Sequence, residues 1–391
     1  MLKQKNLYLY FITFFLIIAF IATVSNTLEF FNQRSINQYS DWLINYQSGF
    51  TRRGLIGEIL FQFHTLTKLP LTFFLYFLVL ILYIVFFTSF YLIIRKIKID
   101  FLDTLIILSP VSFMYTVMEQ KVSGRKDILY LALLSIFILN LKKINFVNQK
   151  YFLILLITIC SLTHSGFIFY SIFFIFLFYM MNLKHGTKQI IIQLIPVVLS
   201  LIFILISLTF FSSHSLDSVS KICLSIKDYL PTCGKGYIMS LNYGLKTNLE
   251  LNTLLWHRPY YFIFYSVAFL ITYFPFFLKS YHSKITNYKN NLLILFLICS
   301  FATFPLYIMG ADYGRYLYLG YVSSILIYYH LISLKIIKTN YVLSFLDKFK
   351  YKYFFASIII IFYGFTFTVP HCCGNNFKFI YSKLISNIKK Y

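Results

Sequence analysis

Residues 71–94 read LTFFLYFLVLILYIVFFTSFYLII, a stretch without a single charged side chain. A helix of about 20 apolar residues spans the hydrocarbon core of a bilayer, which is about 30 Å thick. Because lipid offers the backbone no hydrogen-bond partners, a chain crosses it as a helix or as strands of a closed barrel. Barrel strands alternate apolar and polar residues, and this stretch is continuously apolar. The stretch therefore predicts a membrane-spanning helix.

Similar apolar runs recur along the whole chain of 391 residues, which is 59% hydrophobic and only 12% charged. Soluble proteins carry about 25% charged residues. We predict an all-α, polytopic bundle that forms a single integral membrane domain over residues 1–391, with about eleven spans. The first run lacks a small-residue cleavage site and is expected to remain as a helix. The expected spans are 7–25, 71–94, 101–118, 128–141, 151–163, 166–181, 190–211, 259–278, 291–309, 317–334 and 353–370.

The orientation of the bundle follows from Lys and Arg in the short loops, which stay on the cytoplasmic side. The cations that decide it include Arg95, Lys142, Lys143, Lys184 and Lys284. Placing these inside gives a cytoplasmic N-terminus and an external C-terminus. The long loops 26–70 and 212–258 then face outward. We expect a multi-pass protein of a bacterial inner membrane whose polar residues gather on the periplasmic side.

The net charge of +23 does not indicate a nucleic-acid partner, because the sequence has no soluble domain to carry a binding face. Cations at helix ends and in short loops instead meet anionic lipid or phosphate. The sequence has no Walker A motif, no GxGxxG motif after a strand and no HExxH motif. ATP-driven transport and zinc hydrolysis therefore lack their usual signatures, and we expect neither a cofactor nor a metal.

Four polar clusters fall on the predicted outer face, at residues 41–58, 119–127, 163–166 and 310–316. In the first, Arg52 and Arg53 lie between glycines, which let the backbone approach a ligand closely. Two guanidinium groups can each bind phosphate oxygens in a bidentate manner. The alternative is an interfacial helix whose arginines bind lipid headgroups. Convergence of the four clusters on one face predicts a catalytic or transport cavity at the outer leaflet.

The other three clusters each have a structural alternative. Residues 119–127 could form a solvated turn, and His164 could cap a helical hairpin rather than mark a buried site. Asp312 and Arg315 could simply pair with each other. Their aromatic neighbours could instead form a surface on which a sugar ring stacks.

The cysteines agree with the predicted topology. Cys223 and Cys233 share the outer loop 212–258, where an oxidising periplasm favours a disulfide. Cys160 and Cys299 fall within predicted spans and are expected to be packing residues.

The pattern Asn-Tyr-x-x-Gly-Phe-x-Arg-Arg-Gly-Leu-x-Gly-Glu at residues 45–58, followed by Gly-Arg-Lys-Asp at 124–127 and Asp-Tyr-Gly-Arg-Tyr at 312–316, resembles bacterial surface-polysaccharide membrane proteins. In length and number of spans the chain is similar to Wzy-type O-antigen or capsular polysaccharide polymerases. It departs from them because the tandem arginines directly follow the first span. That placement resembles the GT-C glycosyltransferases, in which an acidic residue of the first outer loop serves catalysis; Asp41 occupies the matching position.

The resemblance implies transfer of a growing glycan from undecaprenyl diphosphate to a lipid-linked repeat unit, and it leaves room for a chain-length regulator as partner. A diphosphate leaving group needs cations that stabilise its developing charge, and the acceptor hydroxyl needs a base. The diphosphate-binding candidates are Arg52, Arg53, Arg125 and Arg315. The catalytic candidates are Asp41, Asp312 and His164. The substrate-binding candidates are Trp42, Tyr46, Glu58, Lys126, Asp127, Tyr313 and Tyr316.

Three other functions remain open on the sequence. The first is a GT-C-type glycosyltransferase that uses a polyprenyl-phosphate sugar donor. The second is a flippase or another transporter of lipid-linked oligosaccharide, although the predicted spans carry almost no charge. The third is an acyltransferase, in which His164 would be the catalytic residue.

The predicted orientation can be tested with reporter fusions. Because Lys143 lies in a short basic loop and Lys235 in a long loop, we expect a fusion at Lys143 to report a cytoplasmic location and one at Lys235 an external location. Alkaline phosphatase and a fluorescent protein, fused in turn at both sites, provide opposite readouts. The reverse pattern would overturn the grouping of the four clusters on the outer face.

Overall fold

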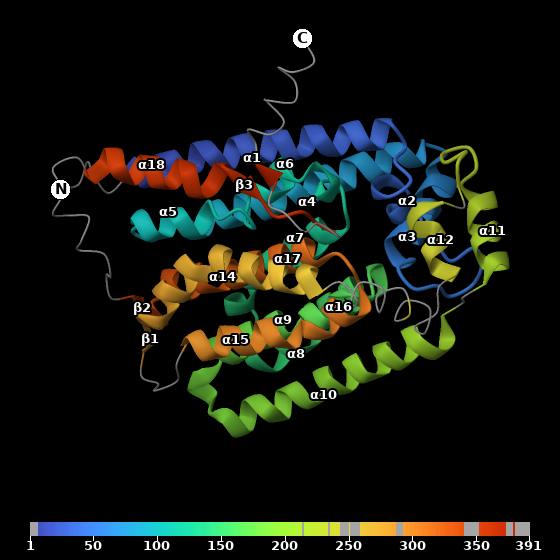
Figure 1. The fold of residues 1–391 in the computed structure, drawn as a ribbon. Helices are drawn as coiled ribbons and strands as arrows, with labels where there is room; N and C mark the ends of the chain where they lie inside the picture. Colours follow the sequence, from blue (N-terminus) through green and yellow to red (C-terminus); the bar gives the residue numbers. More distant parts are fainter. Residues whose placement is uncertain are drawn as a thin grey trace, which may run out of the picture. The chain divides into compact units, whose positions relative to one another are not determined.

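The chain is an all-α helical membrane protein (Figure 1). The computed structural model describes residues 7–212, 215–233, 235–242, 250, 259–286, 292–339, 352–372 and 378–379. The α-helices are α1 (Leu7–Asn32), α2 (Gln38–Trp42), α3 (Leu55–Thr67), α4 (Leu71–Ile94), α5 (Phe101–Ile107), α6 (Tyr115–Met118), α7 (Asp127–Asn140), α8 (Phe146–Thr163), α9 (Phe167–Met181), α10 (Thr187–Ile206), α11 (Leu216–Ser225), α12 (Gly236–Met239), α14 (Pro259–Tyr281), α15 (Leu292–Ala302), α16 (Phe304–Met309), α17 (Tyr313–Ser333) and α18 (Lys352–Phe365). Two short antiparallel pairs are formed by β1 (Ser283–Ile285) with β2 (Ile337–Thr339) and by β3 (Phe367–Thr368) with β4 (Lys378–Phe379).

Six helices of the described chain are long and apolar enough to cross a membrane. They are Leu7–Asn32, Leu71–Ile94, Phe146–Thr163, Thr187–Phe211, Tyr260–Tyr281 and Leu292–Met309. The predicted span 101–118 is not one continuous helix, because α5 ends before Pro110 and only the short α6 follows. Proline lacks an N–H group and disfavours the helical conformation of the residue before it. Apolar composition alone does not reveal such a break.

The described chain divides into two compact units. Unit 1 comprises Met1–Thr23, Phe90–Val122 and Asn252–Tyr391, and unit 2 comprises Val24–Ser89 and Ser123–Leu251. Unit 2 is built around α7, most of whose residues are buried and which packs against α8 and α9. Helix α8 also contacts α3 and α10. A helix that is apolar on all sides belongs in such a central position.

The two ends of unit 2 carry different kinds of basic residues. At one end, Gln149 donates to the carbonyl oxygens of Leu141 (2.9 Å) and Ile144 (3.0 Å), and Asn182 donates to Gln149 (2.7 Å). This end carries the basic turns 142–143 and 184–185. Since α7 and α8 are antiparallel neighbours, the start of α7 and the end of α8 lie at the opposite end. In unit 2, the short loops that carry lysines and the predicted arginine clusters therefore lie at opposite ends.

Unit 1 is built around α17, which is buried over nearly its full length and contacts α14, α15 and α16. Buried tyrosines join its helices: Tyr273 donates to the carbonyl oxygen of Leu317 (2.9 Å) and Tyr321 to that of Ile106 (2.9 Å). Each tyrosine hydroxyl thereby finds a hydrogen-bond acceptor in an otherwise apolar core.

A buried ion cluster closes one end of unit 1. The Lys279 ammonium lies 2.8 Å from a carboxylate oxygen of Asp100 and 2.5 Å from one of Asp103, and Tyr329 donates to the same oxygen of Asp103 at 3.0 Å. Asp100 and Asp103 also form a reciprocal capping box at the start of α5. The cluster ties α5, α14 and α17 together through charge-assisted hydrogen bonds.

Removing Lys279 should destabilise unit 1 strongly, because two neighbouring carboxylates would lose their counter-ion. Breaking a buried pair from one side costs about 3–5 kcal/mol. We expect Lys279→Met to lower the temperature at which Cys299, a buried thiol of α15, reacts with a maleimide dye in detergent. Lys284→Met, at an exposed position of β1, is the matched control and should leave this temperature unchanged. The double variant Lys279→Met/Asp103→Asn should recover part of the loss, and equal midpoints for all variants would contradict the proposed role of the cluster.

Candidate functional site

Lys126 joins three of the predicted polar clusters within unit 2. Its ammonium is fully buried and donates to the carbonyl oxygens of Arg53 (2.8 Å) and Thr163 (3.2 Å). It also lies 3.7 Å from a carboxylate oxygen of Asp41. A buried ammonium is tolerated only when acceptors and a counter-ion surround it. Residues 41–58, 124–127 and 163–166 therefore meet around one positive charge.

The turn before α7 is held in place from two sides. Gly124 adopts the left-handed conformation (φ +74°), which glycine takes without steric cost. Its carbonyl oxygen accepts a hydrogen bond from the Trp42 indole (2.7 Å), and its N–H donates to the Tyr83 hydroxyl (3.2 Å). Trp42 is completely buried, so its ring faces protein and offers no free surface for the predicted stacking on a sugar. Its observed role is to fix the Gly124 turn. Asp127, also buried, begins α7.

The loop between α2 and α3 is organised by Glu58 and Gly57. The Glu58 carboxylate accepts hydrogen bonds from the Tyr46 N–H (2.8 Å) and the Gln47 amide (3.1 Å). A Cβ atom at Gly57 would collide with the carbonyl oxygen of Ile44, so only glycine lets α3 pack this closely. Burial, followed by the charge of Glu58, raises the pKa of Tyr46 to about 12. Glu58 and Tyr46 thus shape the loop that presents the arginines.

Arg53 combines a strained backbone with a poorly satisfied side chain. Its φ of +72° lies in the left-handed region, which is costly for a residue with a Cβ atom. Its Nε and Nη1 atoms are buried and have no hydrogen-bond acceptor among the described residues. The guanidinium lies 5.9 Å from the ring centre of Tyr237.

Two further arginines complete the basic site. The Arg125 guanidinium lies 5.1 Å from the same Tyr237 ring centre and donates to its hydroxyl. Arg52 donates to the carbonyl oxygen of Ser240 (2.6 Å). Burial, and then the positive charge of Arg53, lower the pKa of Arg52 to about 9, so its guanidinium remains charged at neutral pH. Unit 2 therefore holds several cations close together, and their mutual repulsion favours an anionic ligand.

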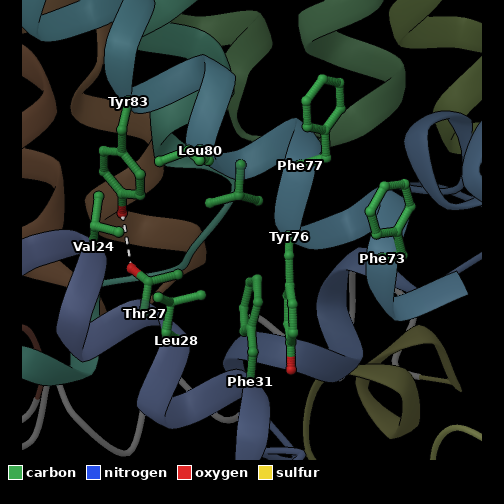
Figure 2. Close-up of a pocket in the computed structure, with 10 residues that line it drawn as sticks. Val24, Thr27, Leu28, Phe31, Phe73, Tyr76, Phe77, Leu80 and Tyr83 are labelled. Atoms are coloured by element: carbon green, nitrogen blue, oxygen red, sulfur yellow. Dashed lines mark hydrogen bonds between the residues drawn. The ribbon is translucent and has the colours of Figure 1, made fainter. Parts of the chain in front are cut away.

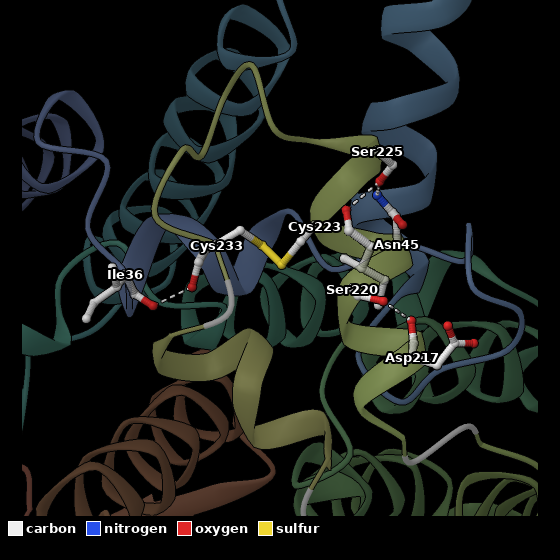
Figure 3. Close-up of a disulfide and its surroundings, with 9 residues drawn as sticks. Ile36, Asn45, Asp217, Ser220, Cys223, Ser225 and Cys233 are labelled. Atoms are coloured by element: carbon white, nitrogen blue, oxygen red, sulfur yellow. Dashed lines mark hydrogen bonds between the residues drawn. A yellow bond between two sulfur atoms is a disulfide. The ribbon is translucent and has the colours of Figure 1, made fainter.

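Tyr237 was not among the predicted residues, and a disulfide holds its segment. Cys223 and Cys233 are bonded, as predicted, and join α11 to the stretch that precedes α12 (Figure 3). Asn45 donates to Ser225 near the same bond (2.9 Å), which connects this segment to the arginine-bearing loop. Gly236 (φ +64°) then packs against the carbonyl oxygen of Ile36. The only sequence signal for Tyr237 is its position shortly after Cys233 and Gly236.

His164 caps the C-terminal end of α8, and its Nδ1 atom accepts a hydrogen bond from the Gly166 N–H (3.2 Å), as in the predicted alternative of a hairpin cap.

Asp312, Tyr313, Arg315 and Tyr316 belong to unit 1, at the start of α17. Arg315 pairs with Asp312 at 3.0 Å, and Tyr313 is buried against Tyr265. The ring of Tyr316 packs edge-on against Tyr307.

The predicted cluster 119–127 is divided between the units. Glu119 and Lys121 belong to unit 1, and Arg125, Lys126 and Asp127 to unit 2. In unit 1, Glu119 contacts His371 at 3.1 Å, which adds a residue that the sequence did not indicate. Among the described residues, no group of three or more His, Cys, Asp and Glu side chains is arranged to hold a metal ion.

Comparison of the chain with protein-family models, with characterised proteins and with solved structures finds no match. The chemistry of the site is therefore inferred from its own geometry. Guanidinium groups that converge on one ring, with a buried carboxylate held by an ammonium beside them, suit a ligand that carries phosphate.

We expect the disulfide to stabilise the basic site as well as the fold. Closing a loop of this length stabilises a protein by about 2–3 kcal/mol. Cys223→Ser/Cys233→Ser should lower the labelling temperature of Cys160, the buried thiol of unit 2, and should weaken binding of inorganic diphosphate. Reduction of the wild type with dithiothreitol, removed before the measurement, should weaken diphosphate binding to the same extent. A double variant that binds diphosphate like the wild type would show that the disulfide does not position Tyr237.

Proposed function

We propose that the chain is a glycosyltransferase of the bacterial inner membrane that polymerises undecaprenyl-diphosphate-linked oligosaccharide repeat units into O-antigen or capsular polysaccharide. We place its site on the periplasmic side of the membrane. The observation that carries the proposal is Arg53, an arginine in the left-handed backbone conformation whose buried Nε and Nη1 atoms have no acceptor among the described residues, beside a second arginine over the same ring.

The strain at Arg53 argues for a ligand. A residue with a Cβ atom in the left-handed region costs about 1–3 kcal/mol, and such residues cluster at functional sites. Each buried donor without an acceptor adds about 1–3 kcal/mol. These costs are offset when an anion accepts the hydrogen bonds. A diphosphate carries enough oxygen acceptors for both Arg53 and Arg125.

The same arrangement suits departure of a diphosphate. As the glycosidic bond breaks, negative charge develops on the leaving oxygen, and fixed guanidinium groups stabilise it without reorganising. Asp41 supplies the candidate base for the acceptor hydroxyl. One of its carboxylate oxygens accepts no hydrogen bond from the described residues and is near only the Lys126 ammonium, at 3.7 Å. This contact orients the carboxylate.

A second function is favoured by the position of Asp41. It lies in α2, the first helix after the long helix α1, as the acidic residue lies in the first outer loop of the GT-C glycosyltransferases that the sequence resembles. Such an enzyme would transfer one sugar from a polyprenyl-phosphate donor. The two functions share the phosphate chemistry and differ in the glycan that is lost when the protein is absent.

Deletion of the gene should abolish the polysaccharide ladder on a gel while single repeat units are still made. Loss of one sugar from the unit would favour the second function, and a normal ladder would remove both.

Complementation with Arg53 variants, at matched expression, tests the site itself. Arg53→Gly relieves the backbone strain, so the protein should be at least as stable as the wild type. It should nevertheless lose about 100- to 1,000-fold in polymerisation rate, as expected when one group that stabilises the transition state is removed. Arg95→Ala, at an exposed position after α4, is the matched control and should give a normal ladder. Full activity of Arg53→Gly would exclude Arg53 from the site.

A further inference from the structure

An apolar groove lies in unit 2 between the second part of α1 and the first part of α4 (Figure 2). Its volume is about 260 Å³, somewhat less than the roughly 300–1,000 Å³ of a pocket that encloses a small ligand. The residues that line it are Val24, Thr27, Leu28, Phe31, Phe73, Tyr76, Phe77, Val79, Leu80 and Tyr83. The groove therefore fits a segment of a long apolar chain.

Flat aromatic faces form much of the wall. Phe31 and Tyr76 are stacked, with ring centres 5.6 Å apart and planes at 13°, and Figure 2 shows the two rings side by side. Phe73 and Phe77 are nearly parallel, with ring centres 6.3 Å apart. In lipid, an apolar groove selects its occupant by shape and packing, since the surrounding tails are equally apolar. Flat faces favour the planar, methyl-branched units of an isoprenoid over a straight acyl chain.

The groove is continuous with the basic site through Gly124. Thr27 and Tyr83 form a hydroxyl pair at 3.3 Å, and the same Tyr83 oxygen accepts the Gly124 N–H. A Cβ atom at Gly124 would lie 3.1 Å from the Thr27 methyl group and 3.2 Å from the Phe31 ring. The next residue, Arg125, carries one of the two guanidinium groups over Tyr237. One turn thus forms both the inner end of the groove and the start of the basic site.

We propose that the α1–α4 groove binds the isoprenoid chain of a lipid-linked phosphate while the arginines of unit 2 hold its head group. The occupant is an isoprenoid diphosphate. This inference rests on the proposed function for its substrate class, but it assigns a separate subsite to residues that carry no charge. Positive charge at one end and an apolar groove at the other match the two halves of such a lipid.

The test is the dependence of affinity on chain length. Purified protein in detergent is titrated with undecaprenyl diphosphate and with geranyl diphosphate, which share a head group and differ in tail length. We expect the wild type to bind the long lipid at least about tenfold more tightly, because several additional apolar groups contact the groove. Leu80→Trp, which fills the groove from a half-exposed position, should remove this preference and leave the affinity for geranyl diphosphate unchanged.

Leu199→Trp is the matched control on the exposed face of α10 and should retain the full preference. If Leu80→Trp also retains it, or if phosphatidylglycerol competes as well as the isoprenoid, the groove proposal is overturned while the proposed function stands. If the wild type binds neither diphosphate, both fail. Loss of the preference in Leu80→Trp supports the groove whatever the polysaccharide ladder shows.

Discussion

The arrangement of unit 2 depends on the buried ammonium of Lys126. With no exposure to solvent, it must find its acceptors within the protein, and it finds them on three separate segments: the Arg53 carbonyl, the Thr163 carbonyl and the Asp41 carboxylate. Leaving this charge without partners would cost several kcal/mol. The three segments are therefore held together by an electrostatic requirement, in a region where the apolar contacts of the helices alone would permit many loop conformations.

The same contact explains how Arg53 can be held in a strained conformation. Its carbonyl is bound by Lys126, and the glycine that follows it allows the loop to pack against Tyr46. The backbone is thus constrained on both sides of the residue, which is the condition under which a left-handed, non-glycine residue persists. The side chain is then directed by the backbone and not by a hydrogen bond of its own, so its donors remain available to a ligand.

Much of this organisation could be predicted from the sequence. Continuous apolar runs indicated the helices, and the distribution of Lys and Arg separated the basic short loops from the arginine clusters, as the two ends of unit 2 show. For residues 41–58, 124–127 and 163–166, the sequence predicted a common face of the membrane and did not predict the contacts between them. Tyr237 could not be identified, because it lies in α12, a helix of four residues that is too short to show periodicity and that follows a disulfide-bonded stretch. Trp42 was predicted to contact sugar, since an aromatic residue in a loop gives no sign of whether its ring is buried.

The position of the Gly124 turn also links the chemistry to the membrane. A lipid-linked substrate has to keep its tail in the bilayer while its head group reacts at the surface, so the enzyme needs one rigid point where the two environments meet. Gly124 is bound by Trp42 on its carbonyl side and by Tyr83 on its N–H side. Because these partners come from α2 and from α4, a shift of either helix would displace Arg125 as well. In the proposed complex, the backbone of this single residue would fix the tail and the head group relative to each other.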